Sequence, residues 1–268
     1  MPASLARPRP VTTLLAVVLC STLALAGCGS GDPEAEPRTA KAVVKSSAGA
    51  TPQAEAGPYA GMEPKEILEL VASTTSDAQS VRVKAVYAED PGPVKFSMRF
   101  VHGRPGRAGR AHGTMKDKAS GTMRFTVIGK IGYIQYGKDM LQDVTDGDTA
   151  VVQVLARRWL KTPVNKGEFG ELLKLLNMNA FINDLVDLSD TGGDLVKVKG
   201  RKYAGRDTIG LKEKGTPGIV YVAADGSGEM VAYKHPDANA IFEDWNKKFT
   251  IKAPTPAFNE DQFFTSGL

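Results

Sequence analysis

Alternation of apolar and polar residues is the strongest pattern in the chain between residues 81 and 137, and it predicts β-strands. In VKFSMRFV, residues 94–101, every second residue is apolar. Similar runs are VRVKAVYAE (81–89), GTMRFTVIG (121–129) and IGYIQYG (131–137). Segments rich in Gly and Pro separate them, as expected of hairpin turns: 91–93, 103–109 and 129–130. Period-two alternation therefore predicts an antiparallel sheet that is covered on one face only.

Three other segments have helical spacing. EPKEILELVASTTSD predicts a helix over about 63–77, with Pro64 in the first turn, where proline is tolerated. TAVVQVLARRW predicts a short helix capped by Asp148, although its valines weaken the prediction. GEFGELLKLLNMNAFINDLVDL (167–188) predicts one or two amphipathic helices. The apolar stripe of this last segment contains Phe169, Leu172, Leu173, Leu176, Phe181, Ile182 and Leu185.

The strand pattern returns in the last third of the chain. RWLKTPV (158–164) predicts a strand before the amphipathic segment. Four more runs follow that segment: LVKVKGRKY (195–203), RDTIGLKEKG (206–215), GIVYVAADG (218–226) and EMVAYKH (229–235). The order of helix, strand meander, helical insertion and second meander predicts an α+β domain, with one sheet wrapped around helices on its apolar face.

The N-terminus has the features of a bacterial lipoprotein signal. Arg7 and Arg9 precede an apolar run, VTTLLAVVLCSTLALA, that ends in small residues before Cys28. The run Leu25-Ala26-Gly27-Cys28 resembles a lipobox, in which the cysteine thiol receives a diacylglyceryl group. Two or three acyl chains hold a protein stably at a membrane, whereas one chain does not. An ordinary secretory signal with an incidental cysteine is the alternative.

Three divisions of the chain follow. Residues 1–27 are expected to be the signal peptide, and 28–62 the lipidated Cys28 with a disordered tether rich in Ala, Gly, Pro and Ser. Residues 63–268 are long enough for a single domain with a substantial core. The expected location is outside the cytoplasm, with Cys28 anchored in the outer leaflet of the cell membrane.

Composition excludes several classes of function. Removal of the signal takes Arg7 and Arg9 and no acid, so the formal charge falls from +4 to +2, too small to favour nucleic acid. The second cysteine, Cys20, lies in the removed segment, so no disulfide is expected. Glycine-spaced arginines in HGRPGRAGRAHG (102–113) are expected in an exposed hairpin loop, with contact to anionic headgroups or wall polymers as the sharper alternative.

No motif indicates a metal site or an enzyme. The three histidines, His102, His112 and His235, lack partners at ligand spacing, and surface histidines explain them better. The aspartates of DVTDGD (143–148) do not match a calcium loop, because the twelfth residue counted from Asp143 is Val154. No P-loop, G-x-G-x-x-G or G-x-S-x-G sequence is present. We therefore expect no catalytic residues, no metal and no cofactor.

The order of these features resembles the LppX/LprG-type lipoproteins of actinobacteria, which belong with the LolA-like fold. The segments that carry the likeness are SVRVKAV, GTMRFTVIGKIGYIQY, RRWLKTPV, GIVYVAADGSGEMVAYKH and FEDWNKKFTIKAP, within residues 63–255. The resemblance implies a strongly curved antiparallel β-sheet, a half-open barrel, with helices packed against its concave apolar face. Several members of the group hold acyl chains of glycolipids or phospholipids in the cavity between sheet and helices.

The resemblance makes a membrane-anchored lipid-binding protein the leading interpretation. The candidate residues for the cavity are Phe96, Met98, Phe100, Met123, Phe125, Val127, Phe169, Leu173, Leu176, Phe181 and Leu185. From periodicity alone the same residues could close on one another as a filled core, because protein interiors normally pack without voids. The alternative is therefore a filled module that binds a protein partner in the cell envelope or acts as a sensor.

Overall fold

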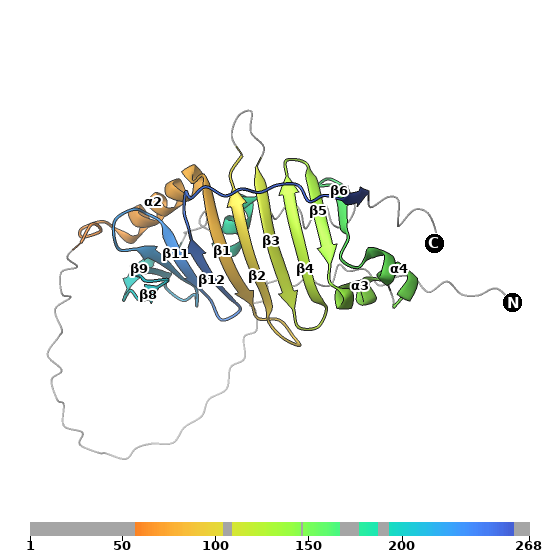
Figure 1. Cartoon of the computed structure of the whole chain (residues 1–268). Helices are drawn as coiled ribbons and strands as arrows, with labels where there is room; N and C mark the ends of the chain where they lie inside the picture. Colours follow the sequence, from red (N-terminus) through yellow and green to blue (C-terminus); the bar gives the residue numbers. More distant parts are fainter. Residues whose placement is uncertain (1–56, 104–108, 146, 167–176, 187–192, 260–268) are drawn as a thin grey trace, which may run out of the picture. The chain divides into compact units, whose positions relative to one another are not determined.

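The computed structural model describes residues 57–103, 109–145, 147–166, 177–186 and 193–259. The chain divides into two units, 1–55 and 56–268, and all the described residues lie in the second. The signal peptide, Cys28 and most of the expected tether therefore fall outside the described residues. The second unit is a thirteen-stranded, curved sheet with few helices, which confirms the α+β prediction (Figure 1).

The first meander supplies one half of the sheet. Its strands are β1 (Ser80–Tyr87), β2 (Val94–Val101), β3 (Arg110–Asp117), β4 (Gly121–Ile128) and β5 (Ile131–Tyr136). Each is antiparallel to the next, and β6 (Trp159–Pro163) continues the sheet beside β5. The four runs expected from alternation and the strand expected at RWLKTPV are all present.

The second meander supplies the other half. Its strands are β7 (Leu195–Val198), β8 (Lys202–Tyr203), β9 (Arg206–Glu213), β10 (Ile219–Ala223), β11 (Met230–Lys234) and β12 (Ala238–Glu243). The full order across the sheet is β13-β6-β5-β4-β3-β2-β1-β12-β11-β10-β9-β7, with β8 paired to β9. The two meanders therefore join where β12 pairs with β1.

Four helices are described in this unit: α2 (Pro64–Asp77), α3 (Lys138–Val144), α4 (Thr149–Leu155) and α6 (Met178–Val186). Helix α2 begins with a capping box, in which the Glu66 carboxylate accepts from the Glu63 backbone N–H at 2.8 Å. Asp148 caps α4 by accepting from the backbone N–H groups of Ala150 and Val151, as predicted. Within the described part of the chain, no helix is long and apolar enough to cross a membrane.

Three strands and one helix escaped the sequence analysis. Strand β3 begins at Arg110, inside the predicted loop, because its inward residues Ala111 and Gly113 are too small to show strong alternation. β12 and the short β13 (Ala257–Asn259) were not expected at all. β13 is parallel to β6, so the sheet is not wholly antiparallel. Helix α3 was not expected, and it contains Asp143, the first aspartate of DVTDGD.

The segment between β12 and β13 runs across the sheet, and we call residues 246–256 the C-terminal strap (Figure 1). The Ser80 hydroxyl donates to the Lys247 carbonyl, and an Arg110 guanidinium nitrogen donates to the Ile251 carbonyl at 3.2 Å. Ser80 and Arg110 point to the outer face of the sheet, opposite the apolar face. The prediction that only one face is covered is therefore wrong at this end of the sheet.

The domain begins earlier than expected. Tyr59, which was assigned to the tether, is 3% exposed and belongs to the core. Its hydroxyl accepts from the Gly228 backbone N–H at 3.0 Å, and its carbonyl accepts from the Lys197 ammonium at 3.0 Å. Residues 57–62 therefore pack on the second meander as part of the domain, which corrects the boundary at residue 63.

Candidate functional site

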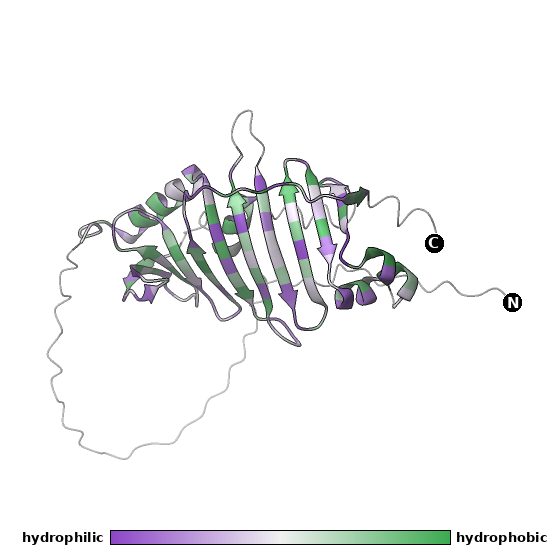
Figure 2. Ribbon diagram, viewed as in Figure 1, coloured by the Kyte–Doolittle hydropathy of each residue, from purple (hydrophilic) through white to green (hydrophobic). Residues whose placement is uncertain are grey.

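The inner face of the first meander is a continuous apolar surface. Strand register aligns inward side chains in rows that cross the sheet. The central row runs through Phe242, Val83, Met98, Gly113, Phe125, Ile134 and Leu160, all of them buried. Figure 2 shows the resulting alternation of hydrophobic and hydrophilic bands along β1 to β5.

Gly113 occupies the middle of this row for a steric reason. A Cβ atom there would lie 2.7 Å from the Ser97 carbonyl oxygen and 2.8 Å from side-chain atoms of Met98 and Phe125. The two neighbouring side chains therefore lean into the space above Gly113 and close the centre of the inner face. The sequence repeat GTM, at 113–115 and 121–123, falls on the paired strands β3 and β4, where Met115 lies opposite Met123.

Helix α6 covers part of this apolar face. The rings of Phe100 on β2 and Phe181 on α6 are 5.4 Å apart, and Met178 and Ile182 are also buried. The Asn177 side-chain carbonyl accepts from the backbone N–H groups of Asn179 and Ala180 and so caps the helix. The cap fixes where α6 begins, close to the ends of β2 and β4.

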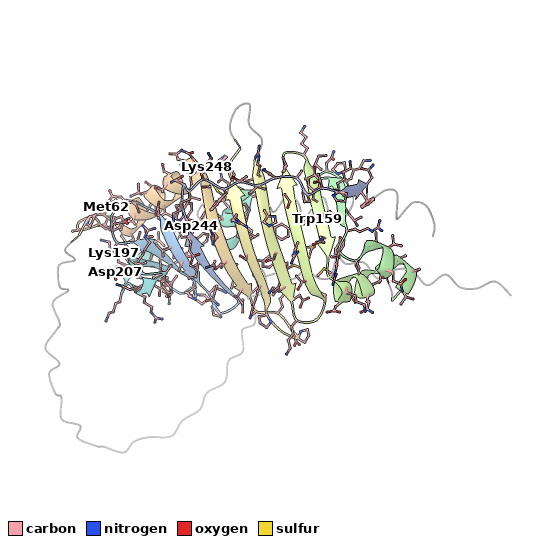
Figure 3. All side chains as sticks on the ribbon, viewed as in Figure 1. Met62, Trp159, Lys197, Asp207, Asp244 and Lys248 are labelled. Atoms are coloured by element: carbon pink, nitrogen blue, oxygen red, sulfur yellow. The ribbon has the colours of Figure 1, made fainter. Side chains whose placement is uncertain are left out.

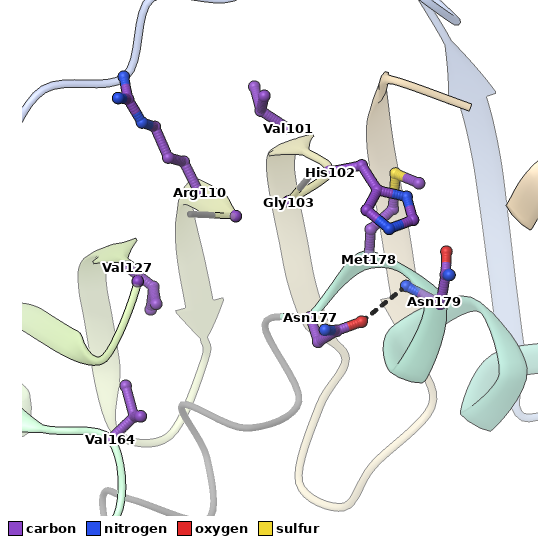
Figure 4. Close-up of a pocket in the computed structure, with 11 residues that line it drawn as sticks. Val101, His102, Gly103, Arg110, Val127, Val164, Asn177, Met178 and Asn179 are labelled. Atoms are coloured by element: carbon purple, nitrogen blue, oxygen red, sulfur yellow. Dashed lines mark hydrogen bonds between the residues drawn. The ribbon is translucent and has the colours of Figure 1, made fainter. Parts of the chain in front are cut away.

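A pocket of about 310 Å³ opens where α6 begins (Figure 4). It lies where several strands end or begin: the end of β2, the start of β3, the end of β4 and the residue after β6. Its lining residues are Val101, His102, Gly103, Gly109, Arg110, Val127, Gly129, Val164, Asn177, Met178 and Asn179. This volume is at the lower end of the range for small-molecule sites.

The pocket has apolar walls and a polar rim. Val127 and Met178 belong both to the pocket and to the buried core, so the pocket is continuous with the inner face. His102, Asn177 and Asn179 supply polar groups, and the buried Oδ1 of Asn179 has no hydrogen-bond donor among the described residues. The Arg110 guanidinium points away, toward the C-terminal strap (Figure 4). Such a pocket can take an apolar chain with a neutral hydrogen-bonding group at its mouth.

The candidate residues for the cavity fall into three groups. Met98, Phe100, Met123, Phe125, Val127 and Phe181 are buried on the inner face or α6, and Phe96 is half-buried beside them. Among the described candidates only Val127 lines the pocket. Phe169, Leu173, Leu176 and the side chain of Leu185 lie outside what the structure describes. Burial alone does not separate a filled core from a lipid cavity, so the assignment stays a prediction.

Sequence analysis missed the rim of the pocket. Val101, Val164 and the Asn177 cap come from segments far apart in the chain, and none of them interrupts a periodic pattern. The glycines at 103, 109 and 129 were interpreted only as turn residues. Glycines clustered at the ends of three neighbouring strands could have indicated that these strand ends are loosely covered.

The outer face of the same strands is basic. Burial and the nearby guanidinium groups of Arg99 and Arg124 lower the pKa of His112, whose Nδ1 lies 2.9 Å from the Thr126 hydroxyl. Arg82 pairs with Asp244 at 3.0 Å, and Lys84 pairs with Glu243 at 2.8 Å. Both carboxylates lie at the β12 side of this face.

Nothing in the described residues assembles a metal site. They contain no group of three or more His, Cys, Asp or Glu side chains that could hold an ion. The Nδ1 atom of His235 lies 3.6 Å from the carboxylate oxygen Oδ2 of Asp237. His102 lines the pocket at the start of α6.

No family model and no curated protein sequence matches the chain. Among solved structures, it is similar to LprF from Mycobacterium bovis, with 13% identity and a TM-score of 0.48, over 71% of this chain and 96% of that one. It is also similar to the lipoprotein LppX of Mycobacterium tuberculosis, with 13% identity and a TM-score of 0.44, over 70% of this chain and 98% of that one. A third similar structure is MucB in complex with MucA(peri), with 12% identity and a TM-score of 0.36, over 72% of this chain and 59% of that one. The solved structures similar to this chain thus include mycobacterial lipoproteins of the LppX/LprG group, the group that its sequence resembles.

Proposed function

We propose that this protein is an exported lipoprotein, anchored in the outer leaflet through acyl chains on Cys28, that holds the acyl chains of a lipid or glycolipid in a hydrophobic cavity. The cavity would lie between the inner face of the first meander and the helical insertion. Carriage or holding of lipid in the cell envelope is the corresponding role, without catalysis.

The observation that carries this proposal is the pocket at the start of α6. Its apolar wall continues into the inner face through Val127 and Met178, and its rim is polar. An acyl chain that entered there would leave water, which contributes about 0.8 kcal/mol for each buried methylene group. The rim would contact the part of the lipid that stays near solvent, with the side chains of His102 and Asn177 as its polar groups.

The first test is native mass spectrometry of residues 29–268, which lack the acylated cysteine, purified from a lipid-containing host. We expect a discrete added mass that organic extraction identifies as an acylated lipid. A bare polypeptide mass, unchanged after incubation with phospholipid vesicles, would contradict the proposal and favour a filled module that binds an envelope protein.

Two adjacent residues provide a matched pair of variants. Val127 faces the pocket, and Ile128 faces the other side of the sheet. Val127→Phe should fill part of the pocket and reduce the lipid-bound fraction, whereas Ile128→Phe should leave it unchanged. Thermal unfolding of both variants controls for stability. Equal lipid retention in the two folded variants would show that the pocket is not the entrance.

A further inference from the structure

The outward positions of β2, β3 and β4 carry cations and no acid. These positions are Lys95, Ser97, Arg99, Val101, Arg110, His112, Thr114, Lys116, Thr122, Arg124, Thr126 and Ile128. The side chains of Lys95, Arg99, Lys116 and Arg124 are exposed. We call these four residues the basic face.

Within the described part of the chain, the basic face has no carboxylate that compensates its charge. Among the described residues, none of its four cations is within ion-pair distance of a carboxylate; Arg124 donates only to the Gln135 side chain, at 3.4 Å. Lys95 lies directly opposite Lys116 in the strand register, whereas Arg99 lies opposite Arg82, whose charge is paired with Asp244. Like charges in directly opposed positions destabilise a sheet. The fold therefore keeps this charge at some cost to its own stability, and an anion bound there would relieve the repulsion.

Residues typical of a membrane interface lie beside the basic face. Tyr133 on β5 and Trp159 on β6 occupy outward positions, next to the buried Ile134 and Leu160, and Ile131 is 37% exposed (Trp159 is labelled in Figure 3). Trp and Tyr rings favour the headgroup level of a bilayer, where one end of the side chain is apolar and the other is wet. Exposed Lys248 and Lys252 on the C-terminal strap extend the positive charge along one end of the face, whereas Lys247 pairs with Asp244 at 2.7 Å (Lys248 and Asp244 are labelled in Figure 3).

We propose that the outer face of the first meander, centred on the basic face, docks the domain onto an anionic membrane surface. Cations supply long-range attraction to the headgroups, and Trp159, Tyr133 and Ile131 supply apolar contact. The combination of charge with apolar contact favours a lipid surface over a nucleic acid or another polyanion. This inference goes beyond lipid uptake. The pocket lies at the ends of the strands, and docking by the basic face needs no cavity.

Co-sedimentation of residues 29–268 with vesicles tests the proposal without any acyl anchor. Vesicles of mixed phosphatidylglycerol and phosphatidylcholine should bind the protein, and phosphatidylcholine vesicles should bind it much less. Each cation near an anionic surface contributes about fivefold in affinity. The double variant Lys95→Glu/Arg99→Glu should therefore bind anionic vesicles at least about 25-fold more weakly. Salt should weaken the binding of the parent more than that of the variant.

A matched control changes the net charge equally at another place. Lys65 and Lys138 are exposed in the first turns of α2 and α3, where acidic residues are favourable. Lys65→Glu/Lys138→Glu should keep vesicle binding close to that of the parent. The single variant Lys95→Glu guards against loss of folding, because it creates an opposite-charge pair with Lys116 and should raise the midpoint of thermal unfolding while weakening vesicle binding.

Three results would overturn the proposal: equal binding to neutral and anionic vesicles, equal loss of binding in the two double variants, or binding to double-stranded DNA without binding to vesicles. The lipid-bound mass of Lys95→Glu/Arg99→Glu separates this proposal from the proposed function. Loss of vesicle docking with retained lipid supports docking by the basic face. Docking that survives in Val127→Phe while its lipid is lost would likewise show that the two functions use different surfaces.

Discussion

At the scale of single residues, the second meander contains a compact charge cluster around Arg206. Its guanidinium group lies 2.6 Å from the Glu229 carboxylate and 2.8 Å from the Asp225 carboxylate. The pKa of Asp225 is lowered to about 2, first by hydrogen bonding from Ser227 and then by Arg206, against an opposing effect of burial. The cluster therefore orders the turn between β10 and β11, against which Tyr59 packs through Gly228.

This cluster should make stability depend on pH in the acid range. A carboxylate whose pKa is lower in the folded state stabilises the fold above its ordinary pKa of 3.8 and loses that effect as pH falls toward 2. Asp225→Asn should therefore unfold at a lower temperature than the parent at pH 6, and the difference should shrink between about pH 4 and 2. Thermal unfolding followed by circular dichroism measures it. Asp207→Asn, at a mostly exposed carboxylate, should show a smaller change, and equal changes would contradict the role of Asp225.

At the scale of elements, the packing of β2, β3 and β4 depends on the absence of a side chain at residue 113. Gly113 has no positive backbone φ, so close packing and not backbone conformation explains why glycine is needed there. The Ser97 carbonyl belongs to the backbone of a central strand and has little freedom to move. The same close approach brings Met98 and Phe125 together over β3.

Gly113→Ala should therefore destabilise the domain through overpacking, by about 1–3 kcal/mol. Gly218→Ala is a suitable control, because the atoms nearest to a Cβ there belong to the Tyr233 side chain, with its hydroxyl at 3.2 Å. Denaturant unfolding gives both free energies. A smaller loss at Gly113 than at Gly218 would show that the centre of the inner face has room to spare.

At the scale of the whole molecule, both ends of the described chain tie distant elements together. Residues 57–62 pack on the second meander through Tyr59. The C-terminal strap runs from β12, past Ser80 and Arg110 on the first meander, to β13, which pairs with β6. The strap also explains why the outward residue Ser80 is buried, because Ser80 donates to the Lys247 carbonyl. These connections lie outside the two meanders that the sequence predicts.

The N-terminal connection predicts where the domain can be shortened. A chain beginning at Gly57 should be as stable as one beginning at residue 29. A chain beginning at Glu63 should lose about 2–4 kcal/mol, because it lacks the burial and the hydrogen bond of Tyr59. The midpoints of urea unfolding compare the three chains. Equal midpoints for chains beginning at Gly57 and at Glu63 would place residues 57–62 in the tether after all.

The sequence by itself determined the features that depend on neighbouring residues. Alternation identified β1, β2, β4 and β5, helical spacing identified α2, and Asp148 identified the start of α4. Each of these signals lies within a short stretch of the chain. Alternation also placed the polar residues of each of these runs on one side of the sheet, opposite its apolar residues. Alternation failed at β3, where Ala111 and Gly113 make the apolar side too small to recognise.

Only the tertiary structure decided the features that join distant segments. The pairing of β12 with β1, the parallel pairing of β13 with β6, the strap and the burial of Tyr59 each connect residues more than 90 positions apart. The opposition of Lys95 to Lys116 and the pocket beside α6 likewise depend on strand register and on where a helix begins. A local pattern predicts which face of the sheet a residue is on. Which residue of another strand lies beside it depends on how the whole chain packs.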